Sequence, residues 1–167
     1  MKINQLLENF PDFSKVYQLA QEGHKNQTRN DKKTPYMVHI DAVILGVWDL
    51  ATQKSQIVTD NHWWAEQYLI VAAAHDLLED TQVTPDQIQK LISNPRFNSE
   101  WILNAIIAIT KKPKGEEEYI NYLQRVAEHP LSRYVKRADL AHNISDLKPG
   151  NMRDKYSVSL WFLENFV

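Results

Sequence analysis

Four ionisable residues follow a run of six apolar residues near the middle of the chain. In the stretch LIVAAAHDLLEDTQVT, residues 69–84, the apolar run leads into His75 and Asp76 and then into Glu79 and Asp80. The apolar run predicts a buried helix, and a buried carboxylate or imidazole without a partner either costs free energy or neutralises. On a continuous helix His75 stands one turn before Glu79, and Asp76 one turn before Asp80, so the four groups converge on one edge. Three neighbouring carboxylates repel one another unless a positive charge lies between them, and a divalent metal ion is the simplest such charge.

A metal site needs ligands from other parts of the chain, because one helical turn cannot enclose an ion. Two positions stand out: His39 in TPYMVHIDA, at the start of an expected helix, and Asp139 in YVKRADLAHN, inside another. With His75 and Asp76 they supply two neutral imidazoles and two carboxylates, whose negative charges balance a dication. Four protein ligands on an ion that accepts six leave room for water and a phosphate oxygen, as a catalytic site requires. Nitrogen and oxygen ligands without sulfur suit manganese, iron, cobalt or zinc, and the residues alone do not rank these metals.

The composition is typical of a soluble globular protein. The 167 residues are 43% hydrophobic and 24% charged, which predicts one domain covering residues 1–167. The net charge of −2 provides no overall attraction for nucleic acid or an anionic membrane, so an anionic ligand requires a local basic patch. The absence of cysteine excludes disulfides and thiolate metal sites, and no segment has the apolar run of a signal peptide or a membrane span. We therefore expect a cytoplasmic protein with no nucleic-acid or membrane partner, whose oligomeric state the sequence leaves open.

Helical spacing of apolar residues recurs along the chain, and no strand-like alternation bounded by hairpin turns is present. Thr84, Pro85 and Gln87 form a helix start, with a capping residue, a proline at the first helical position and a capping-box glutamine. The prediction is an all-α, compact helical bundle of about eight helices. Expected helices in the second half cover residues 100–110, 116–127, 131–147 and 153–166. We expect the tryptophans to pack in the core: Trp48, Trp63, Trp64, Trp101 and Trp161.

The order of the four candidate ligands resembles that of the HD superfamily of metal-dependent phosphohydrolases, which has a distant histidine, an adjacent His-Asp pair and a late aspartate. Between Val16 and Leu163 four segments are similar to its alarmone-hydrolase branch: GHKNQTRNDKKTPYMVHI, AAAHDLLEDTQVTPDQI, AITKKPKGEEEYINYLQRV and YVKRADLAHNISDL. The resemblance implies a helical HD-domain fold with Mn²⁺ as the expected ion. It also implies hydrolysis that removes the 3′-diphosphate of guanosine tetra- or pentaphosphate. The metal ligands it implies are His39, His75, Asp76 and Asp139.

The resemblance also assigns roles to residues around the metal. Glu79 and Asp80 match the acidic pair that positions and deprotonates the attacking water, and a carboxylate beside a metal-activated water is suited to that task. A multiply charged nucleotide needs cations and polar contacts, which the family places in a basic loop, here NQTRNDKKTP at residues 26–35, and after the late aspartate. The residues expected to bind this small-molecule substrate are Arg29, Asn143, Tyr156 and Lys112.

Three positions depart from the family pattern. His39 is followed by Ile40 where the family often has proline, which should shift the local backbone without removing a ligand. Asn30 stands where the family commonly has lysine, and the loss of this cation leaves open which purine or how many phosphates the site accepts. Arg137 replaces a residue that is usually apolar, so we expect it at the surface.

Other interpretations of the same residues stay open. His75 taken alone could be a buried histidine bonded to Asp76 or to a backbone carbonyl, and His142 could either support the site or lie at the surface. The same metal site could act on another nucleotide, such as an adenosine alarmone, a dinucleotide phosphate or a nucleoside monophosphate. A non-catalytic helical module that binds a nucleotide or a protein is a further alternative; its sign would be an eroded site, whereas all six acidic and imidazole positions are present.

Overall fold

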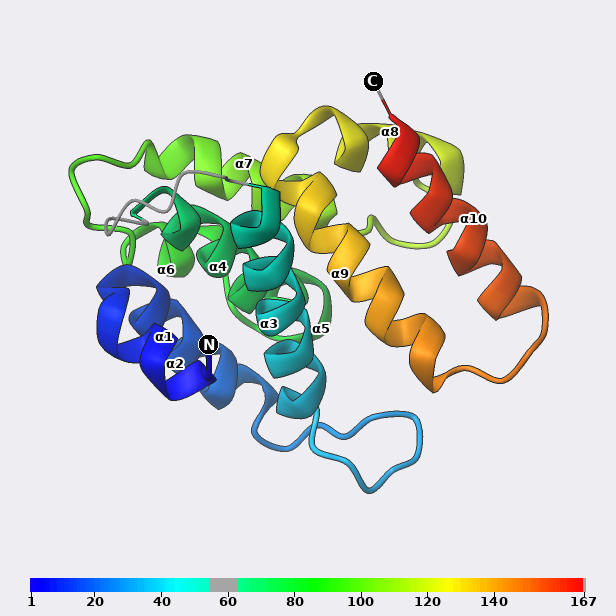
Figure 1. The fold of residues 1–167 in the computed structure, drawn as a ribbon, viewed down its shortest axis with the longest axis horizontal. Coiled ribbons are helices and arrows are strands. Elements are labelled where there is room, and N and C mark those ends of the chain that lie inside the picture. Colours follow the sequence, from blue (N-terminus) through cyan, green and yellow to red (C-terminus); the bar gives the residue numbers. More distant parts are fainter. Residues whose placement is uncertain (55–62, 167) are drawn as a thin grey trace.

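The computed structural model describes residues 1–54 and 63–166, and these ranges form a bundle of helices without sheet strands (Figure 1). The all-α prediction is therefore confirmed. Helices α5 and α6 are single turns, and α1 has no counterpart among the predicted helices. The helices in the described ranges are α1 Ile3–Asn9, α2 Pro11–His24, α3 Met37–Lys54, α4 Trp63–Ala74, α5 Leu77–Asp80, α6 Pro85–Gln89, α7 Ser99–Ile109, α8 Tyr119–Glu128, α9 Pro130–Asp146 and α10 Asn151–Asn165.

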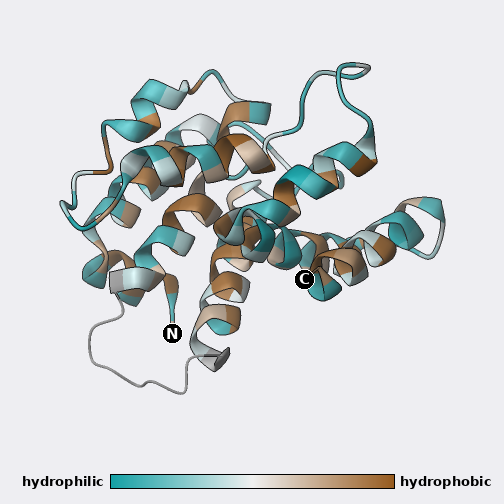
Figure 2. Ribbon diagram, turned by 90° about the horizontal axis from the view of Figure 1, so that it is seen from above, coloured by the Kyte–Doolittle hydropathy of each residue, from teal (hydrophilic) through white to brown (hydrophobic). Residues whose placement is uncertain are grey.

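Helix α4 lies at the centre of the main hydrophobic core. Its residues from Leu69 to Ala74 are completely buried, because α2, α3, α7 and α9 all pack against it. A helix that is apolar on every side is stable only in such an enclosed position. Hydrophobic residues accordingly concentrate where the helices face one another (Figure 2). Since His75 follows directly after this run, the chain delivers an imidazole to the interior.

The chain turns at His75 and Asp76, so the continuous helix expected through Asp80 is wrong. Helix α4 ends at Ala74, and Asp76, with φ −106° and ψ −2°, is the N-cap of the short helix α5. The backbone amide of Asp80 still donates to the carbonyl of Asp76 at 2.9 Å. Because α5 is a single turn, Glu79 and Asp80 lie in its first turn and are also its last two residues.

Helices α3 and α9 lie side by side across the core (Figure 1). Their close approach depends on small residues: a Cβ atom added to Gly46 of α3 would lie 3.3 Å from the Cβ of Ala138 of α9. His39 stands two turns before Gly46, and Asp139 directly follows Ala138. This contact therefore sets the separation between two of the predicted metal ligands.

Side-chain caps fix the ends of several helices. The Thr84 capping box is confirmed, since the Thr84 side chain accepts from the amide of Gln87 and the Gln87 side chain accepts from the amide of Thr84. The Arg125 guanidinium donates to the carbonyls of Ile107, Ala108 and Thr110 and pairs with Glu117. These bonds close the C-terminal end of α7 and hold the segment that contains Lys111. Helix α8 begins at Tyr119 and not at the predicted residue 116.

Helices α8 and α10 form a second apolar cluster against the distal part of α9. Because α10 packs on one side only, its outer face is open, and Trp161 is 65% exposed. The expectation that the tryptophans are core residues is wrong for Trp161 and for Trp101, which is 38% exposed, and correct for Trp48. Trp64 packs at the edge of the main core, and the side chain of Trp63 lies outside the described residues.

The predicted surface position of Arg137 is also wrong. Its side chain is only 13% exposed, because its guanidinium lies over the ring of Tyr134 and pairs with Glu164 of α10 at 3.4 Å. In the described ranges no helix combines the length and the apolar character that crossing a bilayer requires.

Candidate metal centre and adjoining pocket

The four predicted metal ligands, which come from three distant parts of the chain, meet in the interior. His39 Nε2 lies 3.3 Å from His75 Nε2 and 3.1 Å from Asp139 Oδ1. Asp76 Oδ2 lies 2.9 Å from His75 Nε2 and 3.6 Å from His39 Nε2. His39, His75 and Asp139 are buried and Asp76 is partly buried. Residues 36 to 100 positions apart in the sequence thus share one small volume.

The distances between these donor atoms suit a single divalent cation. An ion bound at about 2.1 Å by nitrogen and oxygen holds neighbouring donors roughly 3 to 3.4 Å apart in tetrahedral or octahedral geometry. The separations of 2.9 to 3.6 Å lie in or near this range. Ligand atoms of His39, His75 and Asp76 all lie within 4.8 Å of one another, whereas Asp139 lies outside this set and is close to His39, with Oδ1 3.1 Å from Nε2. The donor set therefore fits a hard or borderline metal ion.

The ring orientations of both histidines also suit ligation through Nε2. His75 Nδ1 lies 2.7 Å from the carbonyl oxygen of Ala72, a contact that requires a proton on Nδ1 and leaves the Nε2 lone pair for a cation. His39 Nδ1 lies 2.9 Å from His142 Nδ1. Burial and the neighbouring His39 lower the pKa of His142, which favours a neutral ring that accepts from His39. Of the two alternatives for His142, the structure places it beside a predicted ligand and not at an unrelated surface.

Without a metal, a proton on His75 supplies part of the positive charge that the neighbouring carboxylates favour. Burial alone would lower the pKa of His75, but the carboxylates of Asp76 and Asp139 outweigh it and raise this pKa to about 9. Burial opposes ionisation of Asp76 too, yet His75 and His39 hold the pKa of Asp76 well below its usual range. The site therefore favours a positive charge among these side chains, and a dication would satisfy that preference in place of the proton.

Asp139 is fixed by partners that the sequence interpretation missed. The buried ammonium of Lys136 lies 2.6 Å from Asp139 Oδ2, and Asn143 Nδ2 donates to Oδ1 at 2.6 Å. Burial would raise the pKa of Asp139, but Lys136 and His39 lower it. The ion pair holds Oδ2, so Oδ1 faces His39. The i, i+3 spacing of Lys136 and Asp139 on one helix was the signal that could have revealed the pair.

The two acidic residues expected to handle the water lie in different surroundings. Asp80 lies beside the centre, where the Tyr36 hydroxyl contacts its Oδ2 at 3.3 Å and also donates to Asp76 Oδ2 at 2.7 Å. Burial, together with Asp76 and Glu79, raises the pKa of Asp80. Glu79 instead pairs with Lys111, whose Nζ lies 3.0 Å from Oε1 and whose backbone amide donates to Oε2 at 3.2 Å.

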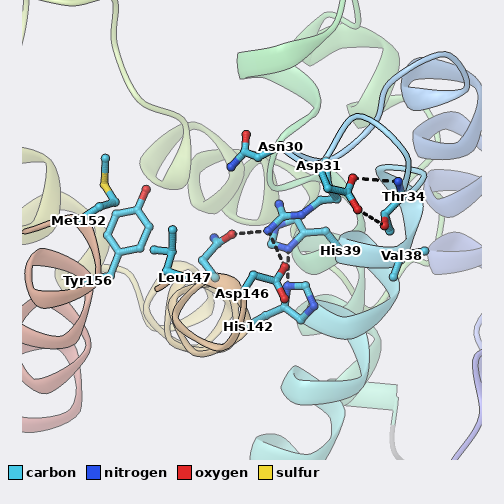
Figure 3. Close-up of a pocket in the computed structure, with 12 residues that line it drawn as sticks. Asn30, Asp31, Thr34, Val38, His39, His142, Asp146, Leu147, Met152 and Tyr156 are labelled. Carbon is cyan, nitrogen blue, oxygen red and sulfur yellow. Dashed lines mark hydrogen bonds and ion pairs between the residues drawn. The ribbon is translucent and has the colours of Figure 1, made fainter. Parts of the chain in front are cut away.

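A pocket of about 680 Å³ opens beside His39 (Figure 3). The close-up shows the side chains of His142 and Asp146 from α9 facing His39 from α3, while Met152 and Tyr156 of α10 form the opposite wall. Leu147, Met152 and Tyr156 give this wall apolar area, and the basic loop with Asn30 and Asp31 closes another side. The pocket thus combines an apolar wall with a polar floor next to the candidate metal ligands.

Three of the four predicted substrate-binding residues line this pocket. They are Arg29, Asn143 and Tyr156, and Arg29 Nη2 donates to Asn143 Oδ1 at 2.8 Å and pairs with Asp146 at 3.2 Å. Lys112 is not among the lining residues that the described part of the chain provides. Asp146 was not predicted from the sequence, although it stands one turn after Asn143 on the same face of α9.

Comparison with known proteins gives one distant relative. The chain is 26% identical over 155 residues to a guanosine-3′,5′-bis(diphosphate) 3′-pyrophosphohydrolase of Aquifex aeolicus (strain VF5). The match covers 87% of this chain but 20% of that protein, so the chain spans about a fifth of the length of its relative. No protein-family profile matches the chain. This similarity supports a relation to alarmone hydrolases.

Proposed function

We propose that the chain is a metal-dependent phosphohydrolase that acts on a phosphorylated nucleotide through one helical HD-type domain over residues 1–167. The carrying observation is that donor atoms of His39, His75 and Asp76 lie 2.9 to 3.6 Å apart beside a pocket, with Asp139 Oδ1 3.1 Å from His39. The most specific substrate we propose is guanosine 3′,5′-bis(diphosphate), with loss of the 3′-diphosphate. The name of the distant relative supports this choice.

We propose that His39, His75, Asp76 and Asp139 hold a divalent cation, with Mn²⁺ as the first ion to test. When bound, such an ion lowers the pKa of water and offsets the negative charge of phosphate oxygens. Lys136 and Asn143 keep Asp139 in the required orientation, since they occupy the carboxylate from both sides.

The carboxylate of Asp80 is the better placed of the two acids to accept a proton from the attacking water. It lies next to Asp76 through the shared Tyr36 hydroxyl, and its raised pKa makes it a stronger base than an exposed aspartate. The water oxygen then forms a bond to phosphorus, the bond between phosphorus and the ribose 3′ oxygen breaks, and that oxygen keeps the electron pair and takes up a proton to leave as a hydroxyl group. Glu79 supports this arrangement from the next position and remains paired with Lys111.

The pocket suits a nucleoside whose phosphates point toward the candidate metal ligands. Among the pocket-lining residues in the described part of the chain, Arg29 is the one lysine or arginine side chain. Its guanidinium is already oriented by Asn143 and Asp146. Arginine binds phosphate through a planar fork of donors, so Arg29 can exchange part of this network for a phosphate group. The apolar wall with Tyr156 offers a surface for the base or sugar.

A nucleotide panel tests the proposal directly. Purified protein with Mn²⁺ is incubated with guanosine 3′,5′-bis(diphosphate), an adenosine alarmone, a dinucleotide phosphate and nucleoside monophosphates, and the release of pyrophosphate and orthophosphate is measured. The proposal predicts pyrophosphate from the guanosine bis(diphosphate) and no release after chelation of the metal. Release of orthophosphate from monophosphates alone would overturn the alarmone assignment. Absence of any product together with absence of bound metal would favour a binding module.

A pair of variants separates chemistry from metal binding. Glu79→Gln should bind Mn²⁺ as the wild type does and lower turnover, because it removes the carboxylate that pairs with Lys111 and helps to raise the pKa of Asp80. Glu8→Gln, an exposed glutamate on α1, is the matched control and should keep full activity. Full activity of Glu79→Gln would remove this residue from the mechanism.

A further inference from the structure

Tyr36 links a predicted metal ligand to the predicted general base. It stands one turn before His39, at the entrance to α3. Its hydroxyl donates to Asp76 Oδ2 at 2.7 Å and contacts Asp80 Oδ2 at 3.3 Å. Asp76 Oδ2 is also the oxygen that lies 2.9 Å from His75 and 3.6 Å from His39. The phenol group therefore reaches the same oxygen that faces the candidate metal position.

The ring of Tyr36 is held from both sides. It stacks on the buried ring of His24, with centroids 4.8 Å apart and an interplanar angle of 24°, and it meets His39 edge-on at 5.6 Å. The guanidinium of Arg29 lies 5.9 Å from the ring centroid. A ring confined by three neighbours keeps its hydroxyl in one place, since a tyrosine side chain has only two rotatable bonds.

Gln27 connects this support to Asp80. Its side-chain oxygen lies 2.7 Å from His24 Nδ1, and its side-chain amide donates to the backbone carbonyl of Asp80 at 2.6 Å. Its backbone carbonyl accepts from the amide of Tyr36 at 3.0 Å. One glutamine thus ties together the ring that supports Tyr36, the backbone of Tyr36 and the backbone of Asp80.

We propose that Tyr36 is a positioning residue whose hydroxyl fixes the Asp76 carboxylate toward His39 and His75 and keeps Asp80 beside it. A carboxylate with a free oxygen can rotate away from a metal position, and a hydrogen bond from a rigid donor prevents that rotation. The hydroxyl has one proton, which the shorter contact assigns to Asp76, so Asp80 is held mainly by the Gln27 bond and by proximity. The part of this inference that concerns Asp80 rests on the proposed function, whereas the part that concerns Asp76 rests on the ligand cluster alone.

The test compares two tyrosine-to-phenylalanine variants. Tyr36→Phe removes the hydroxyl and keeps the ring that stacks on His24. Tyr17→Phe is the matched control, since the Tyr17 hydroxyl donates to Asp41 at 2.8 Å, a bond of the same type that does not involve the predicted ligands. Mn²⁺ is titrated into each metal-free protein in a calorimeter, and thermal melts without metal check that both variants fold. Loss of an outer partner of a metal ligand typically weakens metal affinity by about 10- to 100-fold, which is the result expected for Tyr36→Phe.

The same variants give a second readout in the hydrolysis assay. At saturating Mn²⁺, Tyr36→Phe should lower kcat and leave KM unchanged, because the hydroxyl orients the Asp76 carboxylate beside Asp80 and does not bind substrate. If Tyr36→Phe does not fold, Gln27→Met carries the test, since it removes the tie between His24 and Asp80 and keeps the side-chain length. It should also lower kcat and leave KM unchanged, because Gln27 holds the backbone of Asp80.

The outcomes distinguish this inference from the proposed function. Equal Mn²⁺ affinity of wild type, Tyr36→Phe and Tyr17→Phe would overturn the role of Tyr36 even if the nucleotide is hydrolysed. Weaker Mn²⁺ binding by Tyr36→Phe alone would support that role even if no nucleotide in the panel is hydrolysed. A wild-type protein that binds no Mn²⁺ would overturn both proposals.

Discussion

Replacing Asp139 by asparagine should strongly destabilise the metal-free protein, because it leaves a buried lysine without its counter-charge. Lys136 and Asp139 are 7% and 4% exposed, and their charged atoms lie 2.6 Å apart. Burial opposes the charge on Lys136, but Asp139 and Tyr122 raise the pKa of Lys136 well above its usual value. Removing one partner of such a buried pair costs about 3–5 kcal/mol, since the remaining charge stays desolvated.

Urea unfolding at neutral pH with a chelator, followed by far-UV circular dichroism, measures this cost. The double variant Asp139→Asn with Lys136→Met should recover most of the loss, because no buried charge is left unpaired. Glu164→Gln, which breaks the partly exposed pair with Arg137, is the control and should cost less than about 1 kcal/mol. Mn²⁺ should restore stability to Lys136→Met, where it replaces a lost cation, and not to Asp139→Asn. A cost for Asp139→Asn no larger than that of the control would refute the reasoning.

Three further predictions concern pH, packing and substrate. Folding raises the pKa of His75 above its unfolded value to about 9, so protonation of His75 stabilises the metal-free protein by an amount on the order of 3 kcal/mol. This stabilisation should be complete below pH 6.5 and lost as the pH rises through 9. Urea unfolding midpoints measured across this pH range check the prediction. Mn²⁺ affinity measured by calorimetry should rise over the same window, because the ion displaces that proton. Gly46→Val should cost about 1–3 kcal/mol in urea unfolding and weaken Mn²⁺ binding, because its side chain meets Ala138. Arg29→Ala should mainly raise KM in the hydrolysis assay, because its role is to bind phosphate.

Local features of the fold could be predicted because they depend on neighbours in the sequence. The apolar run before His75 requires a buried helix, and Thr84 with Gln87 starts a helix through bonds that span three residues. Helix α1 was missed, although its start is closed by bonds between Lys2 and Gln5 and its residue Leu6 is buried. The break at Asp76 could not be predicted, since LLED continues a helical pattern and only tertiary contacts turn the chain there.

The candidate site shows the same division between sequence and structure. The sequence by itself determined the fold class and the types of donor atom, since an apolar period of 3.6 residues specifies helices and the histidines and aspartates specify nitrogen and oxygen ligands. Only the tertiary structure decided which atoms meet. The Gly46–Ala138 contact brings α3 and α9 together, and packing directs Tyr36 to Asp76. These partners lie in different elements, and contacts between distant segments follow from how the whole core is filled, which no local spacing encodes.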